Sequence, residues 1–192
     1  ASLLAEAGWK KGEGGFLYKD GRRFEFTLMT NQGNKERQEI AEILQQQLAK
    51  LGIKAEVRVL AWNIFITEFI DKKKFDAVVM GWSTGLDPDS YDIWHSSKVK
   101  EGEFNFVSYA NSRVDRLLVE GRGTFDTEKR KRIYRKIHEL IAADAPYTFL
   151  YSAYGLPAVH KRFHGIDPAP AGIRHNFTKW YVPEELVKYK VN

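Results

Sequence analysis

Hydrophobic and polar residues alternate with two different periods along the first third of the chain. Residues 24–28 alternate with a period of two, which is typical of a half-buried strand. After Asn34, a helix-capping residue type, apolar residues recur at helical spacing until Gly52. Residues 53–60 alternate again with a period of two. Strand, helix and strand in this order predict a βαβ unit with a right-handed crossover.

The beginning of the chain has its own local signals. Asp20-Gly21 is typical of a tight turn that closes a short β-hairpin. Residues 2–7 have the pattern of the last turns of a helix, which Gly8 would end. Because the chain opens inside such an element, we expect it to be a fragment or a processed piece of a longer protein.

The stretch from Phe75 to Asp89 is the most informative one. Its apolar run, Ala77–Met80, predicts a central strand that is covered on both faces. Asp87 followed by Pro88 predicts the start of a short helix, with Asp87 as its N-cap. Trp82 to Asp87 would then lie at the carboxyl end of a strand, where ligand crevices of open α/β sheets are found.

The second half of the chain predicts two helices and then weaker structure. One helix is expected after Asn111 or Ser112, and a longer one after Asp126 or Thr127 that ends before Pro146. Residues 148–151 and 155–160 are predicted as short strands or a hairpin. The predicted fold class is therefore α/β, a mixed β-sheet with helices on both faces. From residue 161 the pattern weakens, and 161–192 is predicted as an irregular tail behind a lobe of residues 1–160.

Composition excludes several kinds of chemistry. The 192 residues include no cysteine, so disulfides, thiolate catalysis and cysteine-ligated metals are excluded. The net charge of +5 is a mild excess on a mixed surface, which is weak evidence for nucleic acid. No apolar run approaches the ~20 residues of a membrane span.

Three motifs invite a chemical interpretation. Asp87-Pro88-Asp89 matches a D-x-D metal motif of sugar-nucleotide transferases, although helix capping explains the same residues. His160 and His164 are spaced as metal ligands only if they lie on a helix, which their neighbours disfavour, and no metal or cofactor is predicted. The basic run 129–136 suggests a nucleic-acid helix, but its apolar stripe favours a solvated face and no nucleic-acid partner.

Trp62 and Trp82 are better candidates for ligand binding. Each follows a predicted strand and offers a large apolar surface with few rotatable bonds. Nothing in the sequence has the pattern of an active site, so we expect a binding protein rather than an enzyme.

The order of motifs resembles the carboxyl-terminal lobe of peptide/nickel-type (family 5) ABC-transporter solute-binding proteins. The resemblance covers nearly the whole chain and is carried by an ordered set of segments: Leu3 to Trp9, Phe24 to Thr30, Asn34 to Ile53, Trp62, Phe75-Asp76-Ala77, Gly81-Trp82, Asp87-Pro88-Asp89, Tyr109-Ala110-Asn111, Val114-Asp115, Arg130 and Pro146-Tyr147.

The resemblance implies a two-lobed clamp whose other, N-terminal lobe is missing here. The tail 161–192 would return toward the hinge and that lobe, and the closed complex would be presented to an ABC permease in the membrane. Localisation would be periplasmic or extracellular, with a peptide or another small molecule as the ligand. The residues that this resemblance and the loop position assign to ligand binding are Trp62, Trp82, Ser83, Thr84, Gly85, Leu86, Asp87 and, loosely, Phe149 or Tyr151.

Two positions depart from the pattern of that family. The loop Ser83–Leu86 lacks the acid that peptide binders often carry before Asp-Pro. Val79 replaces a basic residue that some oligopeptide binders use for the ligand's carboxylate. An oligosaccharide or a hydrophobic compound is therefore an alternative solute, and a D-x-D metal-dependent transferase is the alternative function.

Overall fold

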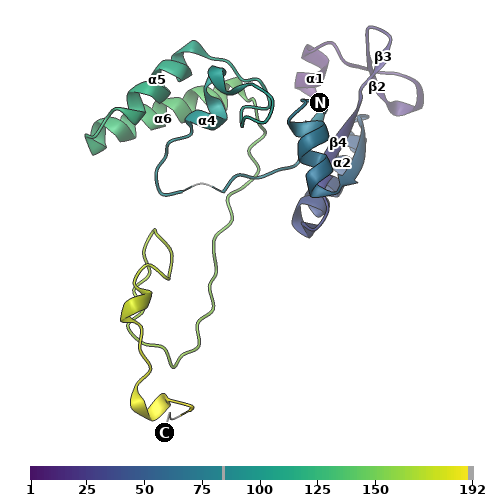
Figure 1. The fold of residues 1–192 in the computed structure, drawn as a ribbon. Helices are drawn as coiled ribbons and strands as arrows, with labels where there is room; N and C mark the ends of the chain where they lie inside the picture. The colour runs from purple at the N-terminus through teal and green to yellow at the C-terminus, as the bar shows by residue number, and fades with distance from the viewer. Residues whose placement is uncertain (84, 190–192) are drawn as a thin grey trace. The chain divides into compact units, whose positions relative to one another are not determined.

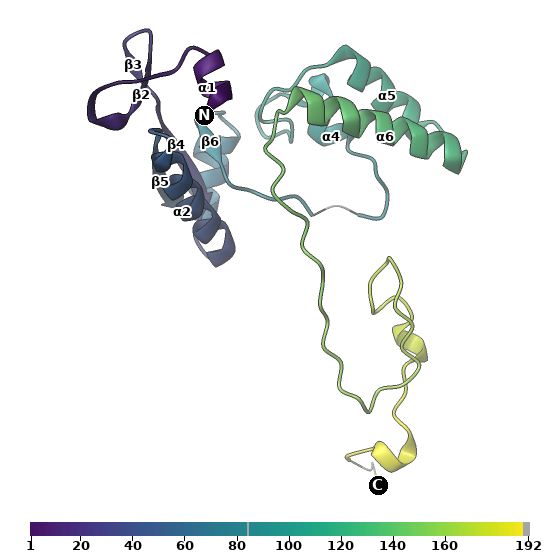
Figure 2. The same ribbon diagram turned by 180° about the vertical axis from the view of Figure 1, so that it is seen from behind.

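The computed structural model describes residues 1–83 and 85–189 (Figures 1 and 2). The α-helices are α1 (Ser2–Glu6), α2 (Lys35–Lys50), α3 (Trp62–Ile64), α4 (Tyr91–Trp94), α5 (Ser112–Arg122) and α6 (Thr127–Asp144). The strands are β1 (Lys10–Lys11), β2 (Leu17–Lys19), β3 (Arg22–Arg23), β4 (Glu25–Asn31), β5 (Lys54–Leu60) and β6 (Ala77–Val78). The shorter segments are the 3-10 turns η1 (Glu13–Gly15), η3 (Ser96–Lys98), η4 (Phe177–Lys179) and η5 (Glu184–Leu186), and the π-helical η2 (Phe65–Ile70).

The chain divides into two compact units. The first consists of residues 1–83 and 89–146, and the second of residues 84–88 and 147–192. The predicted boundary between a lobe and a tail at residue 160 stays a prediction. Within the described residues, no helix combines the length and the hydropathy that a bilayer span requires.

A parallel sheet with the strand order β5-β4-β6 forms the centre of the first unit. Leu28 of β4 lies opposite Val57 of β5 and Ala77 of β6. The predicted βαβ unit is confirmed. The prediction that Ala77–Met80 is a central strand is wrong, because β6 ends at Val78 and lies at the side of this sheet while β4 occupies its middle.

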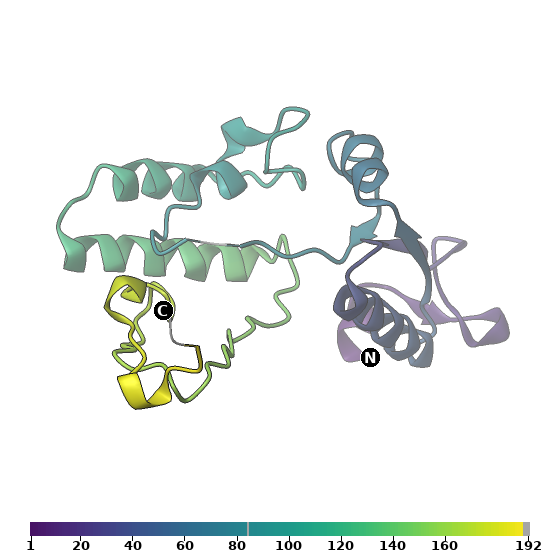
Figure 3. The same ribbon diagram turned by 60° about the horizontal axis from the view of Figure 1, so that its bottom comes forward.

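Helices cover both faces of the parallel sheet, as the sequence predicted. The crossover from β4 to β5 and the crossover from β5 to β6 run in opposite directions across the sheet, and right-handed crossovers then place their helices on opposite faces. Figure 3 shows α2 on one face and the α3–η2 segment on the other. Under α2, buried Leu28, Ala41 and Val79 form a core cluster.

A second, antiparallel sheet is built from β1, β2 and β3. The predicted turn at Asp20-Gly21 is confirmed: φ is 51° and 74° at the two residues, and Tyr18 pairs with Arg23. Positive φ at both positions is the geometry of the hairpin turn whose twist matches its strands. The α/β class is thus confirmed, with antiparallel pairing before β4 rather than after Pro146.

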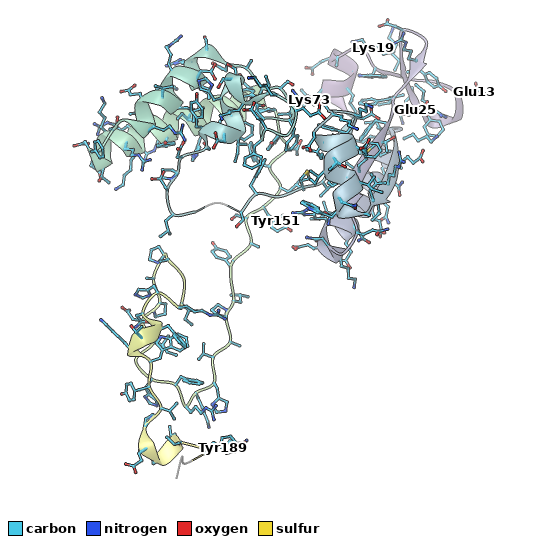
Figure 4. The ribbon with its side chains drawn as sticks, viewed as in Figure 1. Glu13, Lys19, Glu25, Lys73, Tyr151 and Tyr189 are labelled. Atoms are coloured by element: carbon cyan, nitrogen blue, oxygen red, sulfur yellow. The ribbon has the colours of Figure 1, made fainter. Side chains whose placement is uncertain are left out.

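Two antiparallel helices, α5 and α6, complete the first unit and pack side by side (Figures 1 and 3). Asn111 and Asp126 cap them as predicted, through backbone N–H groups that donate to their side chains. Gly121 lies inside α5, where a Cβ would stand 3.0 Å from the Tyr134 ring, and Gly123 is the C-cap residue. Lys73, labelled in Figure 4, lies just after η2. Its Nζ donates to the carbonyl of Val99 at 2.6 Å and so connects the end of η2 to the residue that follows η3.

The second unit has little regular structure. The predicted strands 148–151 and 155–160 are wrong: this segment is extended, and no described residue pairs with its backbone as a strand would. Figure 4 labels Tyr151 on this extended segment. Further along, Phe163, Phe177 and Trp180 pack together beside a cavity of about 610 Å³.

Gly52 allows a matched test of the close approach between α2 and the antiparallel sheet. Its φ is +82°, and a Cβ there would stand 2.5 Å from the Gly15 carbonyl oxygen. At Gly33 φ is +81° and a Cβ would meet nothing within 4 Å. We expect Gly33→Ala to lower the free energy of unfolding by about 1 kcal/mol and Gly52→Ala by at least about 2 kcal/mol. Urea unfolding followed by circular dichroism measures both, and equal losses would contradict the close approach.

Asp144 gives the stability a pH dependence. Its Oδ2 accepts hydrogen bonds from the Tyr109 hydroxyl at 2.6 Å and from Asn111 Nδ2 at 2.7 Å. These donors lower the pKa of Asp144 below its ordinary 3.8. Its stabilising contribution is therefore complete above that value and is lost as the pH falls through the lowered pKa. The difference in unfolding free energy between wild type and Asp144→Asn should shrink between about pH 5 and pH 2; a constant difference would argue against this network.

Candidate functional site

Three parallel strands end at one edge of the sheet, and the candidate site lies there. Asn31 is the last residue of β4, Trp62 follows β5 after one residue, and Trp82 follows β6 by four. The strand order reverses here, since β5 and β6 flank β4 on opposite sides. Such a reversal point, at the carboxyl ends of the strands, is where open α/β sheets bind ligands.

A buried hydrogen bond fixes the loop that carries Trp82. The Thr30 hydroxyl, fully buried, donates to the carbonyl of Val79 at 3.0 Å. The Val79 backbone N–H in turn donates to the Met29 carbonyl at 2.8 Å. The chain therefore leaves the sheet in a defined direction just before Gly81 and Trp82. The side chain of Val79 itself belongs to the core under α2.

Trp82 is supported on one side and exposed on the other. Its ring stacks on that of buried Phe106, with centroids 6.0 Å apart, and lies 5.4 Å from the ring of Phe104. The indole is 40% exposed and Phe104 is 54% exposed. Phe104 also lines a hollow of about 220 Å³ with Lys98 and Glu103. The arrangement offers a fixed aromatic surface to an apolar group.

Trp62 lies on the same sheet edge, at the start of α3. Its ring makes an edge contact with buried Phe65 at 6.3 Å and remains 50% exposed. Two residues of the segment that follows, Phe65 and Ile70, are buried. They lie five residues apart, which is the spacing of a π-helix, in which hydrogen bonds join residues i and i+5.

Arg37 is a polar group at this edge that the sequence reasoning missed. Its Nη1 donates to Asn31 Oδ1 at 2.8 Å, and Asn31 is only 7% exposed. Its backbone N–H donates to Asn34, the N-cap of α2. A cap at Asn34 and a parallel βαβ unit together place residue 37 at the carboxyl end of the strands, so the signal was present in the sequence.

The remaining predicted ligand residues lie elsewhere in the structure. Ser83 is exposed and belongs to the first unit, whereas Thr84 lies outside the described residues. The others, grouped in the second unit and exposed there, are Gly85, Leu86, Asp87 and Tyr151. The structure brings Trp62 and Trp82 to one sheet edge, and ligand contact by the others stays a prediction.

Asp87 does not cap a helix, contrary to the prediction. Helix α4 begins at Tyr91, with Ser90 in the N-cap position. The carboxylate of Asp89 instead accepts from the Tyr91 backbone N–H at 3.1 Å and from Arg122 Nε at 2.6 Å. Arg122 also covers the Tyr91 ring at 4.3 Å. The second acid of the D-x-D motif is therefore engaged in holding α4 to α5, a structural role.

The other two motifs also have structural explanations. Three lysines of the basic run, Lys129, Lys131 and Lys136, form ion pairs with Glu120, Glu128 and Glu139, as on an ordinary solvated face. The two histidines do not lie on a helix: His160 accepts from the backbone N–H of Arg162, and His164 pairs with Tyr181 in an isolated bridge.

Comparison with known families identifies a related group. The family described as bacterial extracellular solute-binding proteins, family 5 Middle, matches residues 1–103. The chain is 41% identical to the oligopeptide-binding protein AppA of Bacillus subtilis over 182 residues, which are 94% of this chain and 33% of that protein. It is 29% identical over 142 residues to a probable di/tripeptide-binding protein of Pseudomonas aeruginosa, covering 72% of this chain and 26% of that protein.

Solved structures agree with this assignment. AppA from Bacillus subtilis in complex with a nonapeptide superposes with a TM-score of 0.74 at 41% identity, over 94% of this chain and 36% of that one. NikZ from Campylobacter jejuni in complex with Ni(L-His) gives a TM-score of 0.71 at 27% identity, over 93% and 37%. The chain thus spans about a third of the length of these relatives.

The hydrogen bond from Thr30 can be tested with two like substitutions on one strand. Thr30→Val should lower the free energy of unfolding by about 1–3 kcal/mol, because it leaves the buried carbonyl of Val79 without its donor. Thr27→Val on the same strand should change it by less than about 0.5 kcal/mol, since the Thr27 hydroxyl makes no hydrogen bond to another described residue. Urea denaturation measures both. Equal effects would mean that the bond does not fix the loop.

Proposed function

Because this chain belongs to the bacterial extracellular solute-binding proteins of family 5, we propose that it forms a lobe that binds peptides for an ABC import system. The carboxyl-terminal lobe is the part of the protein that the sequence resembles. A second lobe would supply the opposite wall, closure would enclose the peptide, and the closed form would be recognised by the membrane permease. The proposed location is the periplasm or the outer face of the cell membrane.

The observation that carries this proposal is the polar and aromatic edge of the parallel sheet. Exposed indoles at Trp62 and Trp82 can contact apolar side chains of many kinds, which suits a site that accepts varied peptides. Backbone groups of the loop after β6 can pair with the peptide backbone independently of its sequence. The mechanism is enclosure without chemical conversion of the ligand.

Peptide relatives support the choice of ligand class. Relatives and solved structures named for oligopeptides or di/tripeptides match the chain, including one bound to a nonapeptide. A likeness to a protein bound to Ni(L-His) keeps a small amino-acid complex as a second candidate, and that ligand also carries a carboxylate. An oligosaccharide has no comparable support among these relatives.

The test is calorimetric titration of the protein at its full encoded length with alanine-rich peptides of about three to nine residues. We expect binding of these peptides and none of maltotriose. Trp82→Ala should weaken peptide binding roughly 30-fold, on the order of 2 kcal/mol, because it removes a supported aromatic surface.

Phe125→Ala is the matched control, since Phe125 is almost fully exposed in the connection between α5 and α6. It should leave peptide affinity unchanged. Preferred binding of maltotriose, hydrolysis of the peptide, or equal effects of the two substitutions would each count against the proposal.

A further inference from the structure

The guanidinium group of Arg37 is held at the sheet edge by a buried partner. Asn31 turns its Oδ1 to Arg37 Nη1 at 2.8 Å, while its Nδ2 donates to the carbonyl of Gln32 at 2.8 Å. This second bond fixes which atom of the Asn31 amide faces the arginine. Gln38 contacts the same residue from α2 through the Asn31 carbonyl, although at a long 3.4 Å. The orientation of Arg37 is therefore set before any ligand arrives.

Most N–H donors of this guanidinium have no protein acceptor among the described residues. Arginine has five N–H donors, and the bond to Asn31 uses one. No aspartate or glutamate among residues 1–83 and 85–189 forms an ion pair with Arg37. By contrast Lys35, on the same helix, pairs with Glu39 at 3.3 Å. A half-buried arginine without a carboxylate partner has N–H groups that can donate hydrogen bonds to an anion.

The position of Arg37 adds an electrostatic argument. It lies in the first turn of the 16-residue helix α2, where the helix dipole disfavours a cation. The buried side chain of Asn31 nevertheless holds the group there. A bound anion would offset this unfavourable interaction between the Arg37 cation and the helix dipole. A purely structural role for Arg37 would leave it in place.

Gly81 keeps the guanidinium accessible. An ideal Cβ at this position would stand 3.5 Å from Arg37 Nη2, in ordinary contact with it. The backbone at Gly81 does not have a positive φ, so no conformational constraint requires glycine here. The absence of a side chain leaves space beside Nη2, directly before Trp82.

We infer that Arg37, oriented by Asn31 and approached past Gly81, binds a carboxylate of the peptide. The inference rests on the proposed function and names a specificity-determining contact within the same site. A planar carboxylate matches the paired donors of a guanidinium. The ligand class is thus a peptide that presents a carboxylate next to an apolar group at Trp82. The carboxylate comes either from the C-terminus or from an acidic side chain.

The test uses one alanine-based hexapeptide with a single glutamate in three forms: the free peptide, its C-terminal amide, and the version with glutamine for glutamate. Calorimetry compares wild type, Arg37→Gln and the control Lys35→Gln at the full encoded length. We expect wild type to bind one of the two modified forms about 10- to 100-fold more weakly than the free peptide. Arg37→Gln should bind all three forms equally weakly, and Lys35→Gln should behave as wild type.

The modified form that loses affinity identifies which carboxylate binds. Gly81→Ala provides a second variant that retains the charge of Arg37, and it should also weaken binding of the free peptide. If Arg37→Gln still discriminates among the forms, or loses no more affinity than Lys35→Gln, the inference is overturned while peptide binding stands. If wild type binds none of the three forms, the proposed function fails and the inference falls with it.

Discussion

The position of β4 between two parallel neighbours is the constraint on which the rest of the first unit depends. Its backbone pairs with β5 over seven positions and with β6 over two, so one strand sets the register of both others. A slip of one residue would turn Leu28 to the opposite face of the sheet, away from Ala41 and Val79. Because all three strands run the same way, their carboxyl ends, and the residues after them, must meet at one edge.

Two polar residues at that edge, Thr30 and Asn31, have hydrogen-bond partners inside the protein. Thr30 and Asn31 are buried at the end of a strand, where an unpaired polar atom would be costly. Thr30 bonds to the loop of β6 and Asn31 to the helix that follows β4. The two side chains therefore connect β4 directly to the segment after β6 and to α2. A site fixed in this way loses little conformational entropy when a ligand binds.

Much of this fold could be predicted because its signals are local. The cap at Asn34, the end of α2 at Gly52 and the turn at Asp20-Gly21 each depend on a few adjacent residues. The failures depend on distant partners. The extent of β6 is set by its pairing with β4, 49 residues away, and the start of α4 lies beside Asp89, which accepts from the Tyr91 backbone N–H and from the distant Arg122.

The residues of the candidate site divide in the same way, into those with local sequence signals and those that depend on distant partners. Trp62 and Trp82 were recognised from their own residue type and position after a strand, and the family resemblance named the loop after Trp82. Residues 148–160 carry a strand pattern, but a strand forms only in a paired ladder, and the structure assigns no strand to this segment. The residue type of Arg37 does not distinguish it from the other charged residues of α2. Only its bond to Asn31, across the βα connection, gives it a fixed direction.

The two kinds of contact at the edge have different consequences for selectivity. An aromatic surface such as that of Trp82 on Phe106 attracts apolar groups of many shapes, so it contributes affinity with little discrimination. In the proposed closed form an oriented guanidinium would be selective, because a ligand without a carboxylate would leave its N–H donors unpaired. Under the proposed function, the first contact would tolerate variation in peptide sequence, and the second would require a carboxylate, from the C-terminus or from an acidic side chain. Trp82 and Arg37 both lie beside Gly81. One wall of the proposed site would therefore combine broad apolar contact with selection for a carboxylate.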